Sequence, residues 1–173
     1  QTNPDVAIAY QTLLEVSREV QAEGWTFNKE GHYPMTPDTN NEILIPNNIL
    51  QIDPTQNASN IELDVVRRSG KLYDKAHHTF TFTKQIECDI TWLFDWVDIP
   101  TPIADFIVSR AAATVSSRIV GDSNQYQMLQ QKEAFNRAMA MEYECNQGDY
   151  TFFGHPGDTN TYRSYKPYNA LYR

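Results

Sequence analysis

Apolar residues in the first part of the chain recur at steps of three and four, which is the period of an amphipathic helix. The stripe consists of Val6, Tyr10, Leu13, Val16 or Ser17, and Val20. Asn3 is suited to cap this helix, Pro4 fits its first turn, and Gly24 is a natural left-handed stop. The pattern therefore predicts a helix from Asn3 to Glu23.

Between residues 28 and 100 the apolar period changes to two. The short runs NEILIP and NILQID have a strand-like composition, and Ser69-Gly70 marks a turn inside NIELDVVRRSGKLYD. In HHTFTFTKQIECDITWLF we expect Phe80 and Phe82 to share one face, followed by a further alternating run. That run places Ile86, Cys88, Ile90 and Trp92 opposite Glu87, Asp89 and Thr91. Alternation indicates one buried face and one wet face, which favours antiparallel strands.

The helical period returns after residue 100 and predicts two further helices, Pro102–Val120 and Ser123–Gln147. The first has an apolar side made of Ile103, Phe106, Ile107, Ala111, Val115 and Ile119, widened by Ala104, Val108 and Ala112. We therefore expect it to be buried from two directions. The second has a face made of Met128, Phe135, Met139 and Tyr143. Methionines at helical spacing, here Met128, Met139 and Met141, are most simply interpreted as core.

The last 25 residues, 149–173, combine aromatic side chains with glycines and prolines that forbid a continuous helix. The aromatic residues are Tyr150, Phe152, Phe153, Tyr162, Tyr165, Tyr168 and Tyr172. A segment without periodicity cannot bury that many rings by itself, so it needs another surface. We expect an extended arm that docks on a neighbouring protein, with Arg163 among its anchors, because Tyr and Arg are enriched at interfaces. The alternative is an arm that wraps its own domain.

These elements predict an α+β fold. A helical bundle is expected from residues 1–27 plus 101–148, with an antiparallel β insert at 28–100 between the first and second helices. Residues 149–173 form the expected C-terminal arm.

The charge of the chain narrows the classes of partner. The formal net charge is −8 over 173 residues, which argues against a protein that binds duplex DNA through a broad basic face. A negative wall is still compatible with DNA that slides past without sticking. The two cysteines, Cys88 and Cys145, form no CxxC pair and are expected to be reduced packing residues. No apolar run approaches the ~20 residues of a membrane span.

No catalytic, cofactor or metal site is predicted. The carboxylate pairs Glu62 with Asp64 and Glu87 with Asp89 have the spacing of a wet strand face. His77 and His78 are adjacent, so as strand residues they would point to opposite faces and could not share a metal ion. Phosphate loops and nucleophile elbows are also missing from the sequence.

Two long stretches carry a resemblance to a known family. They are NPDVAIAYQTLLEVSREVQAEGWTFNKE and WLFDWVDIPTPIADFIVSRAAATVSSRIVGDSNQYQMLQQKEAFNRAMAMEYECNQGDYTFF, separated by the β-rich insert. This layout resembles tail tubular protein A, the adaptor or gatekeeper of short-tailed bacteriophages, over about Asn3 to Phe153. Members of that family have a further helix before the NPDV segment, so this chain, which begins without Met, is expected to be a fragment or a processed form.

The resemblance implies a structural virion protein of the tail. Some members of the family have been suggested to cleave polysaccharide, but no carboxylate of this sequence is singled out for that, so no enzymatic activity and no cofactor are expected. The protein would form a dodecameric ring between the portal protein and the tail nozzle (tail tubular protein B), with the tail fibre as a further candidate partner. DNA would pass through the lumen without sequence-specific binding. The bundle is expected to face the portal and the β part the nozzle. Trp25 and Phe27, at the exit from the first helix, would then fix the angle between two layers that contact different partners.

Two other functions stay open at this point. A polysaccharide-degrading glycosidase would need two carboxyl groups across a groove, about 5 to 10 Å apart. A free-standing protein-binding module would be a stable monomer.

Overall fold

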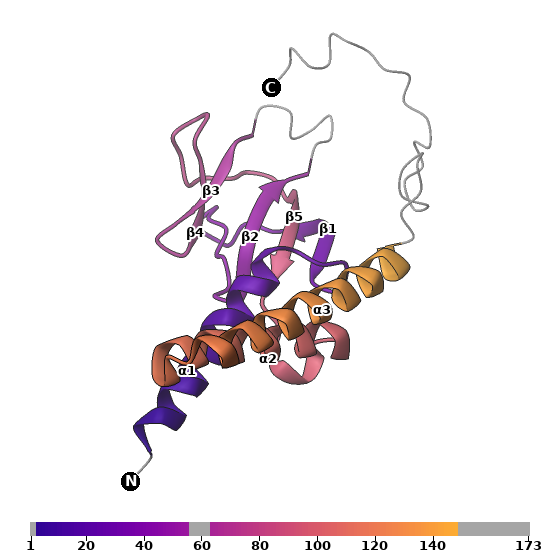
Figure 1. Ribbon diagram of the computed structural model, residues 1–173. Coiled ribbons are helices and arrows are strands. Elements are labelled where there is room, and N and C mark those ends of the chain that lie inside the picture. The colour runs from indigo at the N-terminus through magenta and orange to yellow at the C-terminus, as the bar shows by residue number, and fades with distance from the viewer. Residues whose placement is uncertain (1–2, 56–62, 149–173) are drawn as a thin grey trace.

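The computed structural model describes residues 3–55 and 63–148 (Figure 1). A helix, α1, comes first, five antiparallel strands follow, and two helices, α2 and α3, end the described chain. The strands are β1 Lys29–Met35, β2 Ile49–Pro54, β3 Val65–Arg68, β4 Lys71–Asp74 and β5 Ile86–Trp92. The helices are α1 Pro4–Ala22, α2 Thr101–Val115 and α3 Ser123–Gly148. The predicted α+β fold is confirmed.

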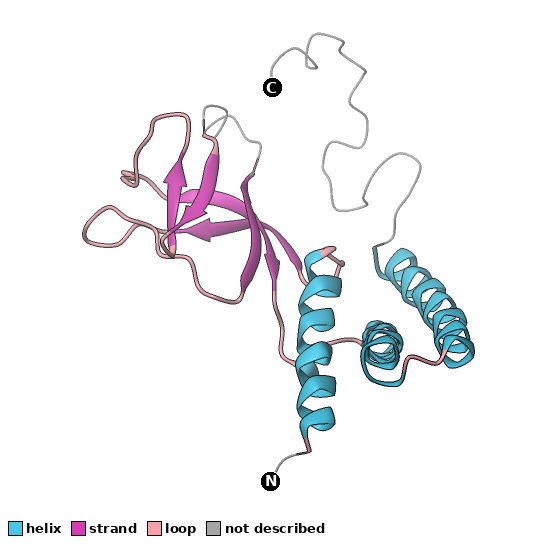
Figure 2. Ribbon diagram, turned by 60° about the vertical axis from the view of Figure 1, so that its left-hand side comes forward, coloured by secondary structure: helices cyan, strands magenta, loops and turns pink. Residues whose placement is uncertain are grey.

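The helices form one layer and the strands another. Figure 2 shows α2 between α1 and α3, with the strands standing beside the C-terminal end of α1. The two layers have separate hydrophobic cores. One contains Val16, Val20, Trp25, Phe106 and Ile107, and the other lies among the strands.

Helix α1 begins and ends where its sequence predicts. Asn3 caps it, because the Asn3 Oδ1 accepts a hydrogen bond from the Asp5 backbone N–H at 3.1 Å. Gly24 follows the helix in the left-handed conformation, at φ 76°. The predicted apolar stripe is buried only in its second half, at Val16 and Val20. Its first half is exposed, because no other described element of the chain covers it.

Helix α2 is the centre of the helical layer. Both α1 and α3 pack against it, as expected for a helix buried from two directions. It continues into a short π-helical segment, Ser116–Val120, and stops at Gly121 in the left-handed conformation. Val108 was expected to widen its buried side, but this side chain is exposed, because α1 and α3 leave one side of the helix open.

Helix α3 differs most from the prediction. Met128, Phe135 and Met139 were expected to face the core, and all three are exposed, as is Met141. Ala140 is buried instead, with Tyr143 packed partly against the helical core. Helix α3 lies on α2 with a mixed side that includes Glu133, Asn136 and Ala140, and its row of larger apolar residues stays outside.

The main sheet has the strand order β1-β5-β2, and both pairs are antiparallel. Strand β1 was not predicted, because Gly31 and Pro34 interrupt its pattern and most of its residues are exposed. The prolines Pro34 and Pro54 both lie in edge strands, where a missing N–H is tolerated. The second sheet is the β3-β4 hairpin, which turns at Ser69-Gly70 as predicted.

Two predicted strands are absent from the described residues. Residues 75–85 form turns and loop instead of a strand, so Phe80 and Phe82 do not share a sheet face. Phe80 packs against Tyr73, with ring centroids 4.7 Å apart and ring planes tilted by 59°, and Phe82 enters the core. The run NEILIP makes only one bridge, from Leu44 to Lys71. Single backbone hydrogen bonds to distant residues hold these loops, and periodicity does not reveal them. The Leu72 N–H donates to the Ile43 carbonyl at 2.9 Å, and the Phe82 N–H donates to the Asn41 carbonyl at 2.8 Å.

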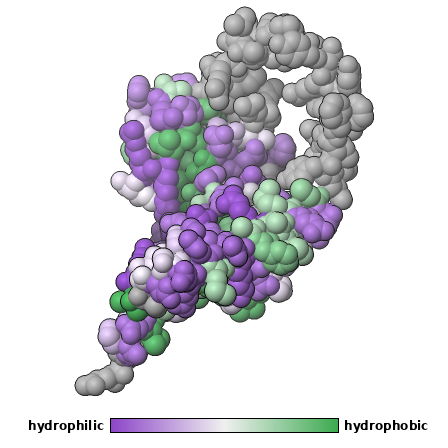
Figure 3. Space-filling view, in the orientation of Figure 1, coloured by the Kyte–Doolittle hydropathy of each residue, from purple (hydrophilic) through white to green (hydrophobic). Residues whose placement is uncertain are grey.

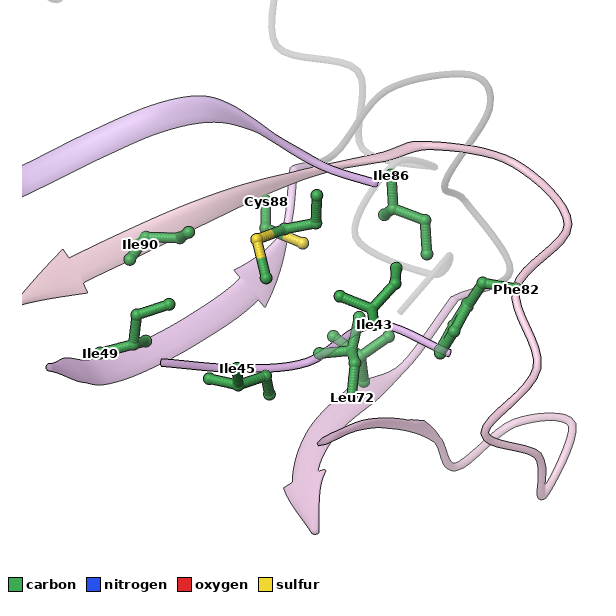
Figure 4. Packing of buried hydrophobic residues seen from close by; sticks show 10 residues of the cluster. Ile43, Ile45, Ile49, Leu72, Phe82, Ile86, Cys88 and Ile90 are labelled. Carbon is green, nitrogen blue, oxygen red and sulfur yellow. The ribbon is translucent and has the colours of Figure 1, made fainter. Parts of the chain in front are cut away.

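The core of the β layer brings together residues from strands and loops (Figure 4). Its members include Ile43, Ile45, Leu72, Phe82, Ile86, Cys88 and Ile90. Ile43 and Phe82 come from loops and close this core from one end. None of the helices in the described part of the chain is both long and apolar enough to span a membrane.

Candidate partner-binding surfaces

Gln21, at the end of α1, connects the two layers. It is fully buried, and both polar atoms of its amide bond to Phe94, just after β5. Its Oε1 accepts from the Phe94 N–H at 2.8 Å, and its Nε2 donates to the Phe94 carbonyl at 3.1 Å. The Nε2 also donates to Ser17 Oγ at 3.1 Å. A buried amide with all its main partners present fixes its neighbours in one arrangement.

Asn28 makes a second connection on the other side of the helix exit. Its Nδ2 donates to the carbonyls of Gln21 and Trp92, each at 2.8 Å. Its Oδ1 accepts from the Trp25 N–H at 2.8 Å. One buried side chain therefore ties the end of α1 to the end of β5. Together, Gln21 and Asn28 with the bonds they make are referred to below as the junction.

Trp25 and Phe27 pack around this junction. Trp25 is 3% exposed. Its Nε1 donates to the Val20 carbonyl at 2.7 Å, so the ring folds back onto the helix it follows. It also meets Phe106 of α2 edge-on, with centroids 6.5 Å apart. Phe27 is half-buried, 6.1 Å from Phe94 between centroids. In this arrangement both rings contact the chain's own helices and strands.

Residues of the same segment, Glu23 and Thr26, also bind helix α3. The Thr26 hydroxyl and backbone N–H both donate to the Glu144 carboxylate, at 2.7 and 2.9 Å. Glu23 lies 3.3 Å from Arg110 of α2 and 3.5 Å from Arg137 of α3. Residues 21–28 therefore contact all three helices and the central strand.

The sequence analysis did not single out Gln21 or Asn28. Gln21 carries a weak signal, because it follows Ser17 by four residues on the buried side of α1 and is polar. Asn28 carries none, since an Asn after a helix is ordinary in a turn.

The first exposed apolar surface is a groove beside α1, of about 630 Å³. It is called the α1 groove here. Its apolar lining is Tyr10, Leu13, Leu14, Leu93, Phe94 and Trp96. Arg18 and Asp95 add opposite charges to its walls. The groove lies at the half of α1 that the helical core leaves uncovered.

The second exposed apolar surface runs along α3 and is called the α3 stripe. It consists of Met128, Phe135 and Met139, which are seven and four residues apart and so lie on one side of the helix. Met128 is 72% and Phe135 66% exposed. Figure 3 shows hydrophobic residues over α3, on the right, and others near the N-terminal end of α1, at the lower left. Exposed apolar residues of this size that gather on one side mark interaction sites.

The carboxylates of the sheet bond to neighbouring groups. Glu87 Oε2 lies 3.1 Å from His32 Nδ1. Asp89 Oδ1 accepts from the Thr55 hydroxyl at 2.6 Å and from the His32 N–H at 3.1 Å. These two carboxylates lie on the outer face of β5, as predicted, and they tie it to the strands on either side. Glu62 lies outside the described residues.

The remaining chemical candidates also have structural surroundings. His77 and His78 lie in a turn and not in a strand, and His77 Nδ1 is 2.6 Å from Asp74 Oδ2. Within residues 3–55 and 63–148, no group of three or more His, Cys, Asp or Glu could hold a metal ion. Both cysteines are free. Both were expected to be packing residues, which is right for the buried Cys88 and wrong for Cys145, because Cys145 lies on the exposed side of α3.

A profile of the family described as tail tubular protein matches residues 1–150. The chain belongs to the tail tubular protein family. The resemblance of the two long helical stretches is thereby confirmed. No curated protein matches the sequence. As a tail tubular protein, the chain is a structural component of the phage tail, and it is located in the virion.

Membership of a tail tubular family also implies partners in tail assembly. The predicted anchors of the C-terminal arm lie outside the described residues: Tyr150, Phe152, Phe153, Tyr162, Arg163, Tyr165, Tyr168 and Tyr172. Within the described part, the junction fixes how the two layers are oriented, and the α1 groove and the α3 stripe offer surface for contacts.

Proposed function

We propose that this chain is the adaptor subunit that joins the portal to the tail nozzle. Copies of it would form a dodecameric ring, and DNA would pass through the lumen during ejection. The tail nozzle is tail tubular protein B in this proposal, and the tail fibre is a further candidate partner. The proposal refines the structural tail role that the family establishes.

The observation that carries this proposal is the junction between the two layers. An adaptor contacts one protein above and another below, so it must hold its two binding surfaces at a fixed angle. The side chains of Gln21 and Asn28 are buried, and they make the hydrogen bonds of the junction. Such bonds resist rotation, because breaking them would leave buried polar groups without partners.

Trp25 and Phe27 have an orienting role in this proposal. Trp25 fills the space between α1 and α2, and Phe27 contacts the segment that leaves β5. The helical layer would face the portal and the β layer the nozzle. The two aromatic rings would then transmit the position of one partner to the other, without touching either.

The arm from residue 149 would anchor the ring to the portal or to a neighbouring subunit. Its proposed anchors are Arg163 and its aromatic residues, which are Tyr150, Phe152, Phe153, Tyr162, Tyr165, Tyr168 and Tyr172. The support for this comes from composition, since Tyr and Arg are the residue types that contribute most at interfaces.

Binding to the portal protein of the same phage tests the proposal. In the full chain, Tyr162, Tyr165 and Tyr168 are changed together to Ala, and in a matched control to Phe. The alanine variant should lose portal binding in sedimentation, whereas the phenylalanine variant should keep most of it, because the rings supply the contact area. An alanine variant that binds like the unmodified chain would contradict the role of the arm. An unmodified chain that never binds portal would contradict the adaptor function.

A further inference from the structure

The α1 groove and the α3 stripe are both apolar, and the first is hollow whereas the second lies along the outside of a helix. The groove is concave, and Tyr10 and Trp96 are among its walls. The stripe is a convex row of two methionines and one phenylalanine. Methionine adapts to irregular apolar surfaces because its side chain is flexible and polarisable. A helix that presents such a row can occupy a groove of this kind.

The charges beside the two surfaces are complementary. Three charged residues line the groove: Glu15, which pairs with Arg118 at 3.2 Å, and Arg18 and Asp95. On α3, Lys132 lies three residues before Phe135, and Glu142 lies three residues after Met139, so both flank the stripe. Within the described part of the chain, no ion pair is formed by Arg18, Asp95, Lys132 or Glu142. Each surface therefore offers one positive and one negative group that the other can pair with.

The two surfaces of a single chain cannot meet. Helix α2 lies between α1 and α3 and packs against both (Figure 2). A contact between groove and stripe must therefore join two molecules.

We infer that the α3 stripe of one copy docks in the α1 groove of the next copy. The contact is heterologous, because two different surfaces meet, and each copy still has one free groove and one free stripe. Repetition of such a contact closes into a ring or continues as a filament. This contact would join neighbouring subunits of the proposed ring. Only the closure of the ring rests on the proposed function.

Mixing two full-length variants tests this arrangement. Leu14→Glu places a charge in the groove, and Phe135→Glu places one on the stripe. Both positions are exposed, so folding is unaffected. Each change buries an unpaired carboxylate at the contact and should weaken self-association more than about tenfold. Val97→Glu is the matched control, since Val97 is 92% exposed and lies outside both surfaces.

Native mass spectrometry gives the expected result. The unmodified chain and the Val97→Glu control should form assemblies that grow with concentration, and each of the two variants alone should stay monomeric. An equimolar mixture of the two should give a one-to-one heterodimer and nothing larger. That heterodimer pairs the intact stripe of the Leu14→Glu chain with the intact groove of the other.

Three results would overturn the inference. They are an unmodified chain that stays monomeric, a variant that assembles like the control, and a mixture without heterodimer. If the stripe instead paired with itself, the Leu14→Glu variant alone would form a dimer. That outcome would also overturn the inference, because this variant would then assemble like the control. Portal binding, measured on the same samples, tests the adaptor function separately. A chain that binds portal while its variants still assemble refutes only this contact.

Discussion

The side-chain amide of Gln21 pairs with the backbone amide of Phe94 in both directions. The Oε1 accepts from the Phe94 N–H at 2.8 Å, while the Nε2 donates to the Phe94 carbonyl at 3.1 Å. These residues are 73 positions apart in the sequence. The pair brings the end of the first helix to the point where the chain leaves the central strand. Gln21 therefore shares with Asn28 the task of fixing the angle between the helical layer and the β layer.

Gln21→Leu should destabilise the fold by about 1–3 kcal/mol, because it removes every hydrogen bond of a fully buried side chain, including both bonds to the half-buried Phe94. Urea unfolding followed by circular dichroism measures the loss. Gln130→Leu makes the same chemical change on the exposed side of α3 and should cost less than about 0.5 kcal/mol. Equal losses in the two variants would show that the buried pair has no special role.

Trp25→Ala should cost about 3–5 kcal/mol, since it removes a large side chain from the helical core. Trp25→Phe should cost less, because a ring remains against Phe106 and only the indole N–H bond to Val20 is lost. Trp96→Ala, at an exposed position, provides the control and should change stability little. A thermal unfolding series over the three variants checks this order, and a Trp25→Ala protein as stable as Trp96→Ala would contradict it.

The protein should lose stability at acid pH through Asp74, the last residue of strand β4. Burial by itself would raise the pKa of Asp74, but hydrogen bonds from His77 and from the backbone of Ala76 outweigh it, so the pKa is lowered from 3.8. A carboxyl group with a lowered pKa in the folded state stabilises the fold above its unfolded pKa. That stabilisation is lost as the pH falls through the folded pKa, so the loss begins below about pH 3.8.

The Asp74→Asn variant should therefore be less stable than the unmodified chain at neutral pH and should lose less stability between neutral pH and pH 3. Denaturant midpoints at several pH values measure both effects. Asp98→Asn, at an exposed position, should leave the pH profile unchanged. An Asp74→Asn protein with the unmodified profile would mean that this carboxyl group does not contribute to acid sensitivity.

The two thiols should differ strongly in reactivity. Burial, with added repulsion from Asp89 and Asp53, raises the pKa of Cys88 to about 12, whereas Cys145 is exposed. Only a thiolate reacts with a disulfide reagent such as DTNB. One thiol should therefore be labelled quickly in the folded protein, and the second should react only after unfolding. Cys145→Ser should abolish the rapid phase. A rapid phase that survives in that variant would place Cys88 within reach of solvent.

Much of the architecture follows from local patterns. The end of α1 at Gly24 and the turn at Ser69-Gly70 depend on residues that permit positive φ, and both are recognisable in the sequence. The period-two run around Ile90 predicted the central strand in the same way. Strand β1 could not be predicted, because an edge strand with few buried residues shows no alternation.

The buried sides of helices are harder to predict than the helices themselves. Periodicity gives a row such as Met128, Phe135 and Met139, but it does not distinguish a row that faces the core from one that faces another molecule. In α3 the helix lies on the row that contains Ala140, where Glu133 and Asn136 also make polar contacts with α2. The junction was not predicted either. The partners of Gln21 and Asn28 lie at the end of β5, far away in the sequence, and local patterns do not reveal such contacts.

Both outer strands of the main sheet carry a proline, Pro34 in β1 and Pro54 in β2, and β1 also contains an irregularity between Glu30 and Tyr33. A strand edge interrupted in this way is a poor template for a foreign strand. The exposed edges of the sheet are therefore poorly suited to pair with the sheet of a neighbouring protein during virion assembly.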